Sequence, residues 1–164
     1  MIVFKRATSK DHFEVIAKLA HDIWHEHYTP IIGKDQVNYM VDKFQTSEAM
    51  QKQAEEGYEY YLLEYQNNDV GYLAIEKRND DLFLSKIYLL KNCRGKGLGK
   101  EAFSFIEKRA RDLNCKSISL TVNKNNRNTI KAYEKIGFKN TEAIVMDIGN
   151  GFVMDDYRMV KNFA

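Results

Sequence analysis

The sequence predicts one α/β (α+β) domain over residues 1–164, with a mixed, mostly antiparallel central sheet of about seven strands flanked by about four helices. Three observations lead to this fold class. The length of 164 residues suits one domain with its own hydrophobic core. The composition, with 44% apolar and 29% charged residues, is that of an ordinary soluble globular protein. Strand-like and helix-like stretches also succeed one another without an internal repeat, a linker or a low-complexity segment.

The first third of the chain is predicted to form a strand and then three helices. Alternating polarity predicts the strand, and apolar residues at three- and four-residue intervals predict the helices. Thr8, Ser9 and Asp11 are suitable N-caps for the first helix, while Pro30 and Gly33 are expected to end it. The expected ranges are 2–7 for the strand and 13–24, 37–44 and 47–57 for the helices.

The remaining two thirds are predicted to be richer in strands. Turn-forming residues at 67–69, 79–81 and 149–151 separate successive strands. Apolar residues on one face predict a long helix after a glycine-rich stretch, and Gly137 suits the C-cap of a shorter one. The expected ranges are 58–65, 70–75, 82–90, 117–122, 138–146 and 152–160 for the strands, and 98–113 and 129–136 for the helices.

Charge and hydropathy exclude several classes of protein. The net charge of +2 is too small to favour binding to nucleic acid or to an anionic membrane. No apolar run approaches the roughly 20 residues that a membrane-spanning helix needs. The first residues lack the apolar centre of a signal peptide, so a cytoplasmic location is expected. Cys93 and Cys115 form neither a CxxC pair nor a disulfide framework.

A glycine-rich stretch raises the question of a phosphate-binding loop. Residues 91–101 read K-N-C-R-G-K-G-L-G-K-E, between an apolar strand and a helix. Glycines let the backbone approach an anion closely, and free N–H groups at a helix start suit a phosphate. The stretch is one residue short of a P-loop, and it lacks the spacing and the later acidic residue of a dinucleotide-binding fold. The remaining pattern, R-x-x-G-x-G, indicates a pyrophosphate loop of another kind, with a purely structural turn as the alternative.

A second motif follows, where residues 125–138 read N-N-R-N-T-I-K-A-Y-E-K-I-G-F. Together, R-x-x-G-x-G and N-x-x-[AST]-I-x-x-Y-E-K-x-G-F resemble the GNAT superfamily of acetyl-CoA-dependent N-acetyltransferases. The resemblance covers nearly the whole chain in the order of its elements and is specific over residues 82–138. It is weak in the first 60 residues, where members of such families differ according to their acceptors.

The resemblance implies acetyl-CoA as the cosubstrate and assigns residues to it. In this family the strand before the loop separates from its neighbour, and its free backbone groups bind pantetheine. A backbone N–H there, that of Leu89, would polarise the thioester carbonyl as an oxyanion hole does. The residues that match cofactor-binding positions in these two segments are Ile87, Tyr88, Leu89, Arg94, Gly95, Lys96, Gly97, Leu98, Gly99 and Lys100.

The second motif is implied to contribute both to the cofactor site and to the chemistry. Tyr133 matches the general acid of the family, which contacts the cofactor and protonates the leaving thiolate. Asn126 or Asn128 matches an asparagine that touches the cofactor, with a turn residue or an N-cap as the alternative reading of each. Lys135 is expected either to reach a cofactor phosphate or to be solvated.

The resemblance implies that an amine attacks the thioester directly in a ternary complex. Glu26 and Tyr28 lie in the first helices, which usually wall the acceptor site of this family. Acids beside aromatic residues suggest a small primary amine such as a polyamine. An amino acid, an antibiotic or a protein amine remains open as the acceptor. The alternative function is a catalytically silent sensor module that binds acyl-CoA.

The sequence does not single out a general base or a metal site. Leu84-Ser85-Lys86 has no carboxylate on the strand where some relatives place one. His21 and His25 are one helical turn apart, which can chelate a metal, but no H-E-x-x-H occurs and no metal is expected. Small dimers are common in the family, so a homodimer is considered beside a monomer. The candidates for the base are Glu26, His25, His27, Asp156 and a water relay.

Overall fold

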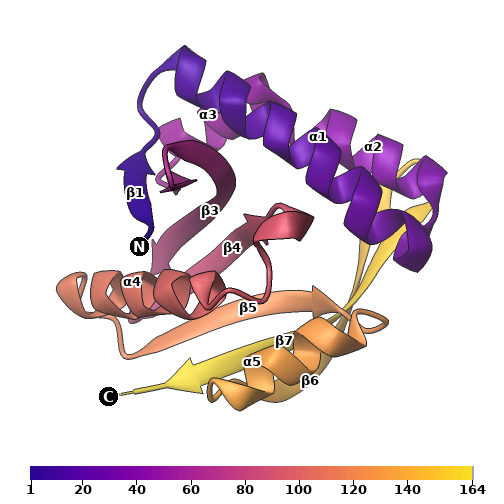
Figure 1. Cartoon of the computed structure of the whole chain (residues 1–164). Helices are drawn as coiled ribbons and strands as arrows, with labels where there is room; N and C mark the ends of the chain where they lie inside the picture. The colour runs from indigo at the N-terminus through magenta and orange to yellow at the C-terminus, as the bar shows by residue number, and fades with distance from the viewer. Residues whose placement is uncertain (164) are drawn as a thin grey trace.

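The computed structural model describes residues 1–163, which form a seven-stranded sheet with helices on both faces (Figure 1). The mixed sheet and its helical layers confirm the predicted fold class, with five α-helices rather than about four. The strands are β1 (Val3–Arg6), β2 (Glu59–Tyr65), β3 (Asn68–Arg78), β4 (Asp81–Leu89), β5 (Ser117–Asn123), β6 (Lys139–Gly149) and β7 (Phe152–Asn162). The helices are α1 (Lys10–Ile32), α2 (Lys34–Phe44), α3 (Ser47–Glu55), α4 (Leu98–Asp112), α5 (Arg127–Lys135) and the short 3-10 helix η1 (Lys91–Cys93).

The sheet separates two hydrophobic cores. Its strands lie in the order β1-β2-β3-β4-β5-β7-β6, and every neighbouring pair is antiparallel except β4 with β5. Helices α1–α3 cover one face, where Ile16 and Met50 are fully buried. Helix α4 covers the other face through Leu98 and Ile106. No helix within residues 1–163 is long and apolar enough to cross a membrane.

Helix α1 begins at one of the predicted N-caps, Ser9, and continues past Pro30 to the expected stop at Gly33. The Ser9 hydroxyl accepts from the His12 N–H at 3.2 Å, which caps the start. The helix runs through Pro30 to Ile32, so the expectation that this proline ends it is wrong. Proline removes only one backbone donor, and the Gly33 N–H still closes the last turn on the Thr29 carbonyl at 3.0 Å.

A β-bulge divides the side chains of β4 between the two faces. Ala74 of β3 pairs with Lys86, whereas the next residue, Ile75, pairs with Leu84. Ser85 is therefore an extra residue, and it reverses the alternation of side chains along the strand. Leu84 packs in the core beneath α4, while the Lys86 side chain points to the face covered by α1–α3.

The parallel strands β4 and β5 separate along their length (Figure 1). They pair only between residues 81–83 and residues 117–119, although β4 continues to Leu89 and β5 to Asn123. Beyond this short ladder the backbone of β4 is paired only with β3. A small cavity lined by residues of β4, β5 and α5 lies where the two strands have separated.

We predict that Gly71→Ala destabilises the protein, because β3 and β4 approach closely at this residue. A Cβ on Gly71 would lie 2.2 Å from the Tyr88 carbonyl oxygen, so the end of β4 would have to move. The expected loss is about 1–3 kcal/mol in the free energy of unfolding, measured by urea denaturation. Gly99→Ala is the matched control, since its Cβ would meet no atom within 4 Å. Equal stability of the two variants would contradict the prediction.

Candidate active site

The glycine loop leaves free backbone N–H groups at the start of α4. Gly95 and Gly97 both have φ of +77°, a left-handed conformation that favours glycine. The Glu101 N–H donates to the Gly97 carbonyl, and no side chain caps this helix end. The N–H groups of residues 98–100 therefore have no intrahelical acceptor. A Cβ on Gly95, Gly97 or Gly99 would meet no atom within 4 Å, which leaves room for a ligand.

Arg94 ties the glycine loop to the end of β4 and to α1. Its guanidinium donates to the Leu89 carbonyl, from Nε at 3.1 Å and from Nη2 at 3.0 Å. It also pairs with the carboxylate of Glu26, with 3.3 Å between Nη2 and Oε2. Sequence analysis assigned Arg94 to the cofactor and Glu26 to the acceptor, and the structure places the two side chains in contact.

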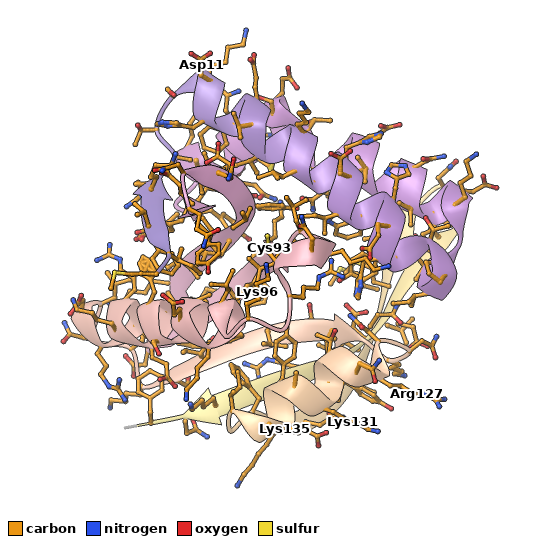
Figure 2. The ribbon with its side chains drawn as sticks, viewed as in Figure 1. Asp11, Cys93, Lys96, Arg127, Lys131 and Lys135 are labelled. Atoms are coloured by element: carbon orange, nitrogen blue, oxygen red, sulfur yellow. The ribbon has the colours of Figure 1, made fainter. Side chains whose placement is uncertain are left out.

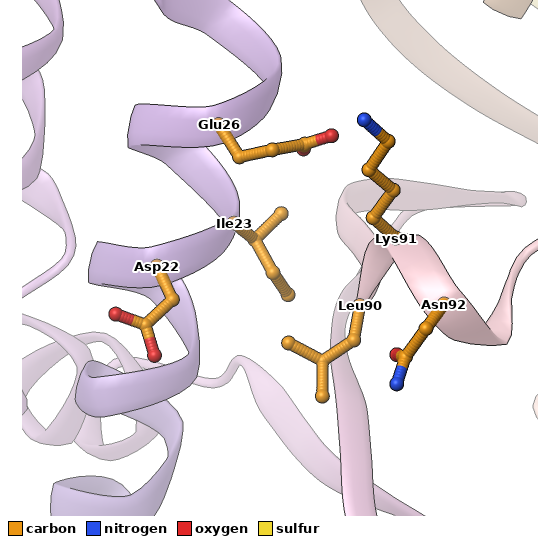
Figure 3. Close-up of a pocket in the computed structure, with 6 residues that line it drawn as sticks. All are labelled: Asp22, Ile23, Glu26, Leu90, Lys91 and Asn92. Atoms are coloured by element: carbon orange, nitrogen blue, oxygen red, sulfur yellow. The ribbon is translucent and has the colours of Figure 1, made fainter.

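Glu26 borders a hollow of about 600 Å³ between α1 and η1 (Figure 3). Ile23 and Leu90 contribute apolar side chains to its lining. In Figure 3 the side chains of Glu26 and Lys91 extend toward each other at one side of the hollow. Glu26 does not line the cavity that contains Asp156, so the structure separates these two candidates for the base.

The end of β4 directs alternate backbone groups toward the gap beside β5. The Leu90 N–H donates to the Val70 carbonyl of β3 at 2.8 Å. Because successive N–H groups of a strand point to opposite sides, those of Leu89 and Ile87 point away from β3. The backbone of Tyr88 faces β3 instead. Two of the three residues predicted to bind pantetheine thus present backbone groups to the gap, and Tyr88 does not.

Tyr133 lies on α5, beside the same gap. Its ring packs against Phe103 and Phe138, with 5.8 Å between ring centroids in each case. Together with Tyr28 and Asn126 it lines the cavity between β4 and β5. Burial raises the pKa of the Tyr133 hydroxyl above its usual value, so the phenol keeps its proton at neutral pH.

The other residues of the second motif differ in their placement. Asn126 is 5% exposed and lines the Tyr133 cavity, and its side chain does not cap α5. Asn128 is exposed on the helix. Lys135 is exposed as well, at four-residue intervals from Lys131 and Arg127 along α5 (Figure 2). Of these three residues, Asn126 lines the cavity with Tyr133, and Asn128 and Lys135 do not.

Asp156 is a buried carboxylate on β7. It is 6% exposed and lines a cavity together with Tyr28 and Tyr88. Burial, followed by the negative charge of Asp155, raises the pKa of the Asp156 carboxyl to about 6, although the Lys124 ammonium opposes the shift. A carboxylate whose pKa lies this close to neutral is suited to accept a proton from a substrate.

The His25 side chain contacts residues of both α1 and α2. Its ring nitrogens lie 2.7 Å from the His21 carbonyl oxygen and 2.6 Å from the Asn38 Oδ1. The rings of His21 and His25 are 4.3 Å apart between centroids. Residues 1–163 contain no group of three His, Cys, Asp or Glu side chains placed to hold a metal ion.

His27 is the remaining histidine candidate. Its ring packs edge-on against Tyr28, with 4.7 Å between centroids. Burial, followed by the positive charge of Arg94, lowers the pKa of His27. It does not line the cavities around Tyr133 or Asp156. Among the four side chains considered as the base, Asp156 is the one placed in a cavity with Tyr28.

A larger cavity of about 620 Å³ lies between the helices and the β6–β7 hairpin. The hairpin is held on α2, because Tyr39 Oη and Lys43 Nζ both donate to the Ile148 carbonyl at 2.7 Å. Ser85 and Tyr88 line both this cavity and the one that contains Tyr133, so the two are neighbours. Apolar side chains that line it include Trp24, Met40, Phe44, Phe83, Met146 and Met154.

Four charged residues of this cavity received no role in the sequence analysis: Arg78, Asp81, Lys86 and Arg158. Lys86 is 6% exposed, and its Nζ donates to the Tyr60 hydroxyl at 2.6 Å. Burial lowers the pKa of Lys86 to about 7. A single lysine within an apolar strand was the available signal. The face of the sheet to which the Lys86 side chain points depends on the bulge at Ser85, and the alternation of residues in the sequence does not predict a bulge.

Comparison with known sequences identifies the family. The model of the Acetyltransferase (GNAT) family matches residues 18–138. An uncharacterized N-acetyltransferase of Bacillus subtilis (strain 168), YycN, is 31% identical to this chain over 80 residues. That match covers 46% of this chain and 51% of the relative, so the two proteins align over about half of their lengths.

Solved structures share the fold. The PaiA N-acetyltransferase from Thermoplasma acidophilum in complex with coenzyme A superposes with a TM-score of 0.81, at 18% identity and with 99% of both chains covered. A GCN5-related N-acetyltransferase from Rhodopseudomonas palustris gives a TM-score of 0.82 at 14% identity, covering 98% of this chain and 95% of that one. Since the family match extends over residues 18–138 and includes the glycine loop and Tyr133, this chain belongs to the GNAT acetyltransferase family.

Proposed function

We propose that this protein transfers an acetyl group from acetyl-CoA to a small amine within a ternary complex. The observation that carries the proposal is the gap between β4 and β5, which has the glycine loop near one end and Tyr133 and Asp156 beside it. Family membership and the coenzyme A held by the relative from T. acidophilum support the choice of cosubstrate. A cytoplasmic location and a homodimer stay predictions.

The chain's own residues fit a coenzyme A ligand. The free N–H groups of residues 98–100 and the positive end of the α4 dipole suit a pyrophosphate. Lys96 adds positive charge, whereas that of Arg94 is partly balanced by Glu26. The backbone groups of Ile87 and Leu89 that face the gap suit the amides of pantetheine. When bound, acetyl-CoA supplies an acetyl group activated as a thioester with a thiolate as the leaving group.

Three groups of the protein are proposed to carry the reaction. Asp156 takes a proton from the acceptor nitrogen as the new C–N bond forms. The Leu89 N–H donates to the carbonyl oxygen, where negative charge develops. Tyr133 gives its proton to the sulfur as the C–S bond breaks, and its raised pKa keeps that proton available. The products are an N-acetylated amine and a free thiol.

The alternative function is a silent acyl-CoA sensor. A sensor needs the glycine loop but has no need of a buried carboxylate beside the gap. Asp156 therefore favours the enzyme. Release of free thiol from acetyl-CoA in the presence of amines separates the two functions, because a sensor would bind the cofactor without turnover.

We predict that Gly97→Asp abolishes thermal protection by acetyl-CoA. Aspartate tolerates a left-handed backbone better than most residues and is a favourable N-cap, so the variant should fold. Its carboxylate would stand where the pyrophosphate is proposed to bind. The wild-type Tm should rise by about 5–10 °C at roughly a hundredfold excess over Kd. Gly97→Asn is the uncharged control and should keep more of this shift. Full protection of Gly97→Asp would refute the loop assignment.

We predict that Asp156→Asn stabilises the protein while it impairs turnover. The pKa of Asp156 is about 6 in the folded protein and 3.8 in the unfolded chain. The cost of ionising the buried carboxyl is therefore absent below about pH 4 and complete above about pH 7. At pH 8 the variant should gain about 1–3 kcal/mol in the free energy of unfolding, and this gain should vanish near pH 4. Loss of the base should lower kcat by about 10²–10⁴-fold.

Asp155→Asn is the matched control for this experiment. Asp155 is exposed and pairs with Lys124 at 2.7 Å, so its loss should not slow turnover substantially and should change stability less than Asp156→Asn does. If Asp156→Asn turns over as fast as the wild type, a water relay or another residue serves as the base. If it is no more stable at pH 8, the carboxylate of Asp156 is better solvated than its burial indicates.

We predict that Tyr133→Phe lowers kcat by about 10²–10⁴-fold and leaves the affinity for acetyl-CoA nearly unchanged. The substitution keeps the ring that packs on Phe103 and removes only the proton donor. Tyr157→Phe is the matched control, because Tyr157 packs against the core beneath α4 and lines none of the three cavities near the gap. A kcat for Tyr133→Phe within about threefold of wild type would rule out the acid role.

A further inference from the structure

The cavity of about 620 Å³ contains two cations that lack an anionic partner within residues 1–163. Its charged lining consists of Arg78, Asp81, Lys86 and Arg158. Arg78 pairs with Glu76 at 2.6 Å, and the carboxylate of Asp81 accepts from the hydroxyls of Ser117 and Ser119. Lys86 and Arg158 take part in no ion pair. Asp81 has no cationic partner among residues 1–163 either, so the cavity holds two cations and one carboxylate without an ion pair, and its unpaired charge is positive on balance.

Lys86 shows the imbalance most clearly. Its Nζ donates to the Tyr60 hydroxyl at 2.6 Å, to the Phe44 carbonyl at 3.3 Å and to Gln53 Oε1 at 3.4 Å. All three acceptors are neutral, and a buried ammonium without a carboxylate is unfavourable. Burial lowers the pKa of Lys86 to about 7, and no carboxylate of residues 1–163 stands beside the ammonium to oppose that shift. A carboxylate brought by a ligand would supply this counter-charge.

Arg158 and Asp156 place opposite charges at the two ends of the neighbouring cavities. The two residues are two positions apart on β7, so their side chains project from the same face of the strand. Asp156 lines the neighbouring cavity, with Tyr28, at the end nearer the proposed reaction. Arg158 lines the larger cavity with Lys86. A ligand that spans both cavities would meet an acid at one end and two cations at the other.

We infer that the acceptor is an aminocarboxylate, such as an amino acid with an apolar side chain, whose carboxylate is bound by Lys86 and Arg158 while its amino group faces Asp156. The apolar side chain would pack among Met40, Phe44 and Met154. This inference rests on the proposed function. A polyamine would instead bring further positive charge to two unpaired cations, and Asp81, the carboxylate of this cavity, already accepts from the hydroxyls of Ser117 and Ser119.

The experiment compares amino acids with their methyl esters, which lack the negative charge. For each of the twenty common amino acids, kcat/KM with acetyl-CoA is measured for the free acid and for the ester. The ratio of the two values is then compared between the wild type and the variants Lys86→Met and Arg158→Gln. The different basicity of the two amines is the same for every variant and cancels. Lys77→Met is the matched control, since Lys77 is exposed and does not line the cavity.

The inference predicts that the wild type prefers free acids and that each variant lowers the acid-to-ester ratio by about 10–100-fold, the scale of a charged hydrogen bond. Lys77→Met should keep the wild-type ratio. Two variants are used because Lys86→Met changes a buried hydrogen-bond network, whereas Arg158 is only half-buried.

Two outcomes would overturn the inference. If amines without a carboxylate, such as polyamines, are acetylated faster than every free acid, or if neither variant changes the ratio, the acceptor does not use these cations and the proposed function still stands. If no amine is acetylated and acetyl-CoA gives no thermal protection, the proposed function fails as well.

Discussion

The separation of β4 from β5 is the constraint on which the rest of the site depends. A parallel ladder that continued beyond residues 81–83 would pair the backbone of β4 on both sides. Because it stops there, the Leu89 N–H and carbonyl remain available, and unpaired backbone groups inside a protein are costly. Arg94 satisfies the carbonyl, and the N–H is free to bind a ligand. The same separation leaves the cavity that Tyr133 and Tyr28 both line.

Burial shifts the pKa values of Asp156 and Lys86 in opposite directions. It raises the pKa of Asp156 to about 6 and lowers that of Lys86 to about 7, because each loses the water that stabilises its charged form. Both groups can therefore change protonation near neutral pH. In the proposed reaction only Asp156 exchanges a proton with the amine. Lys86 stays protonated when an anion lies beside its ammonium group. A ligand with one amine and one carboxylate would stabilise both.

The β-bulge at Ser85 connects the fold to this electrostatic arrangement. Without the extra residue, Lys86 would share a face with Leu84 and would point into the core beneath α4. With it, the lysine reaches Tyr60 below the α1–α3 helices. The β6–β7 hairpin then completes the cavity by its bonds to α2. One irregularity of a single strand thus decides which residues an acceptor would meet.

The sequence by itself determined the fold class, the order of the elements and the positions of both motifs. These features depend on local information: periodicity marks strands and helices, and glycines mark the loop before α4. Element ends were less well predicted, as at Pro30, because the surrounding helix can tolerate the loss of one donor. The roles proposed for Leu89, Asn126 and Tyr133 came from the family resemblance and remain predictions.

Only the tertiary structure decided which distant side chains share a cavity. It placed Glu26 against Arg94, gathered Asp156 with Tyr28 and Tyr88, and brought Lys86 and Arg158 into one cavity. These residues come from segments that are far apart in the chain. Their meeting depends on strand register, on a bulge and on the docking of a hairpin, which are set by packing and pairing between segments. Sequence patterns report periodicity within one segment, so they could propose the candidates but could not bring them together.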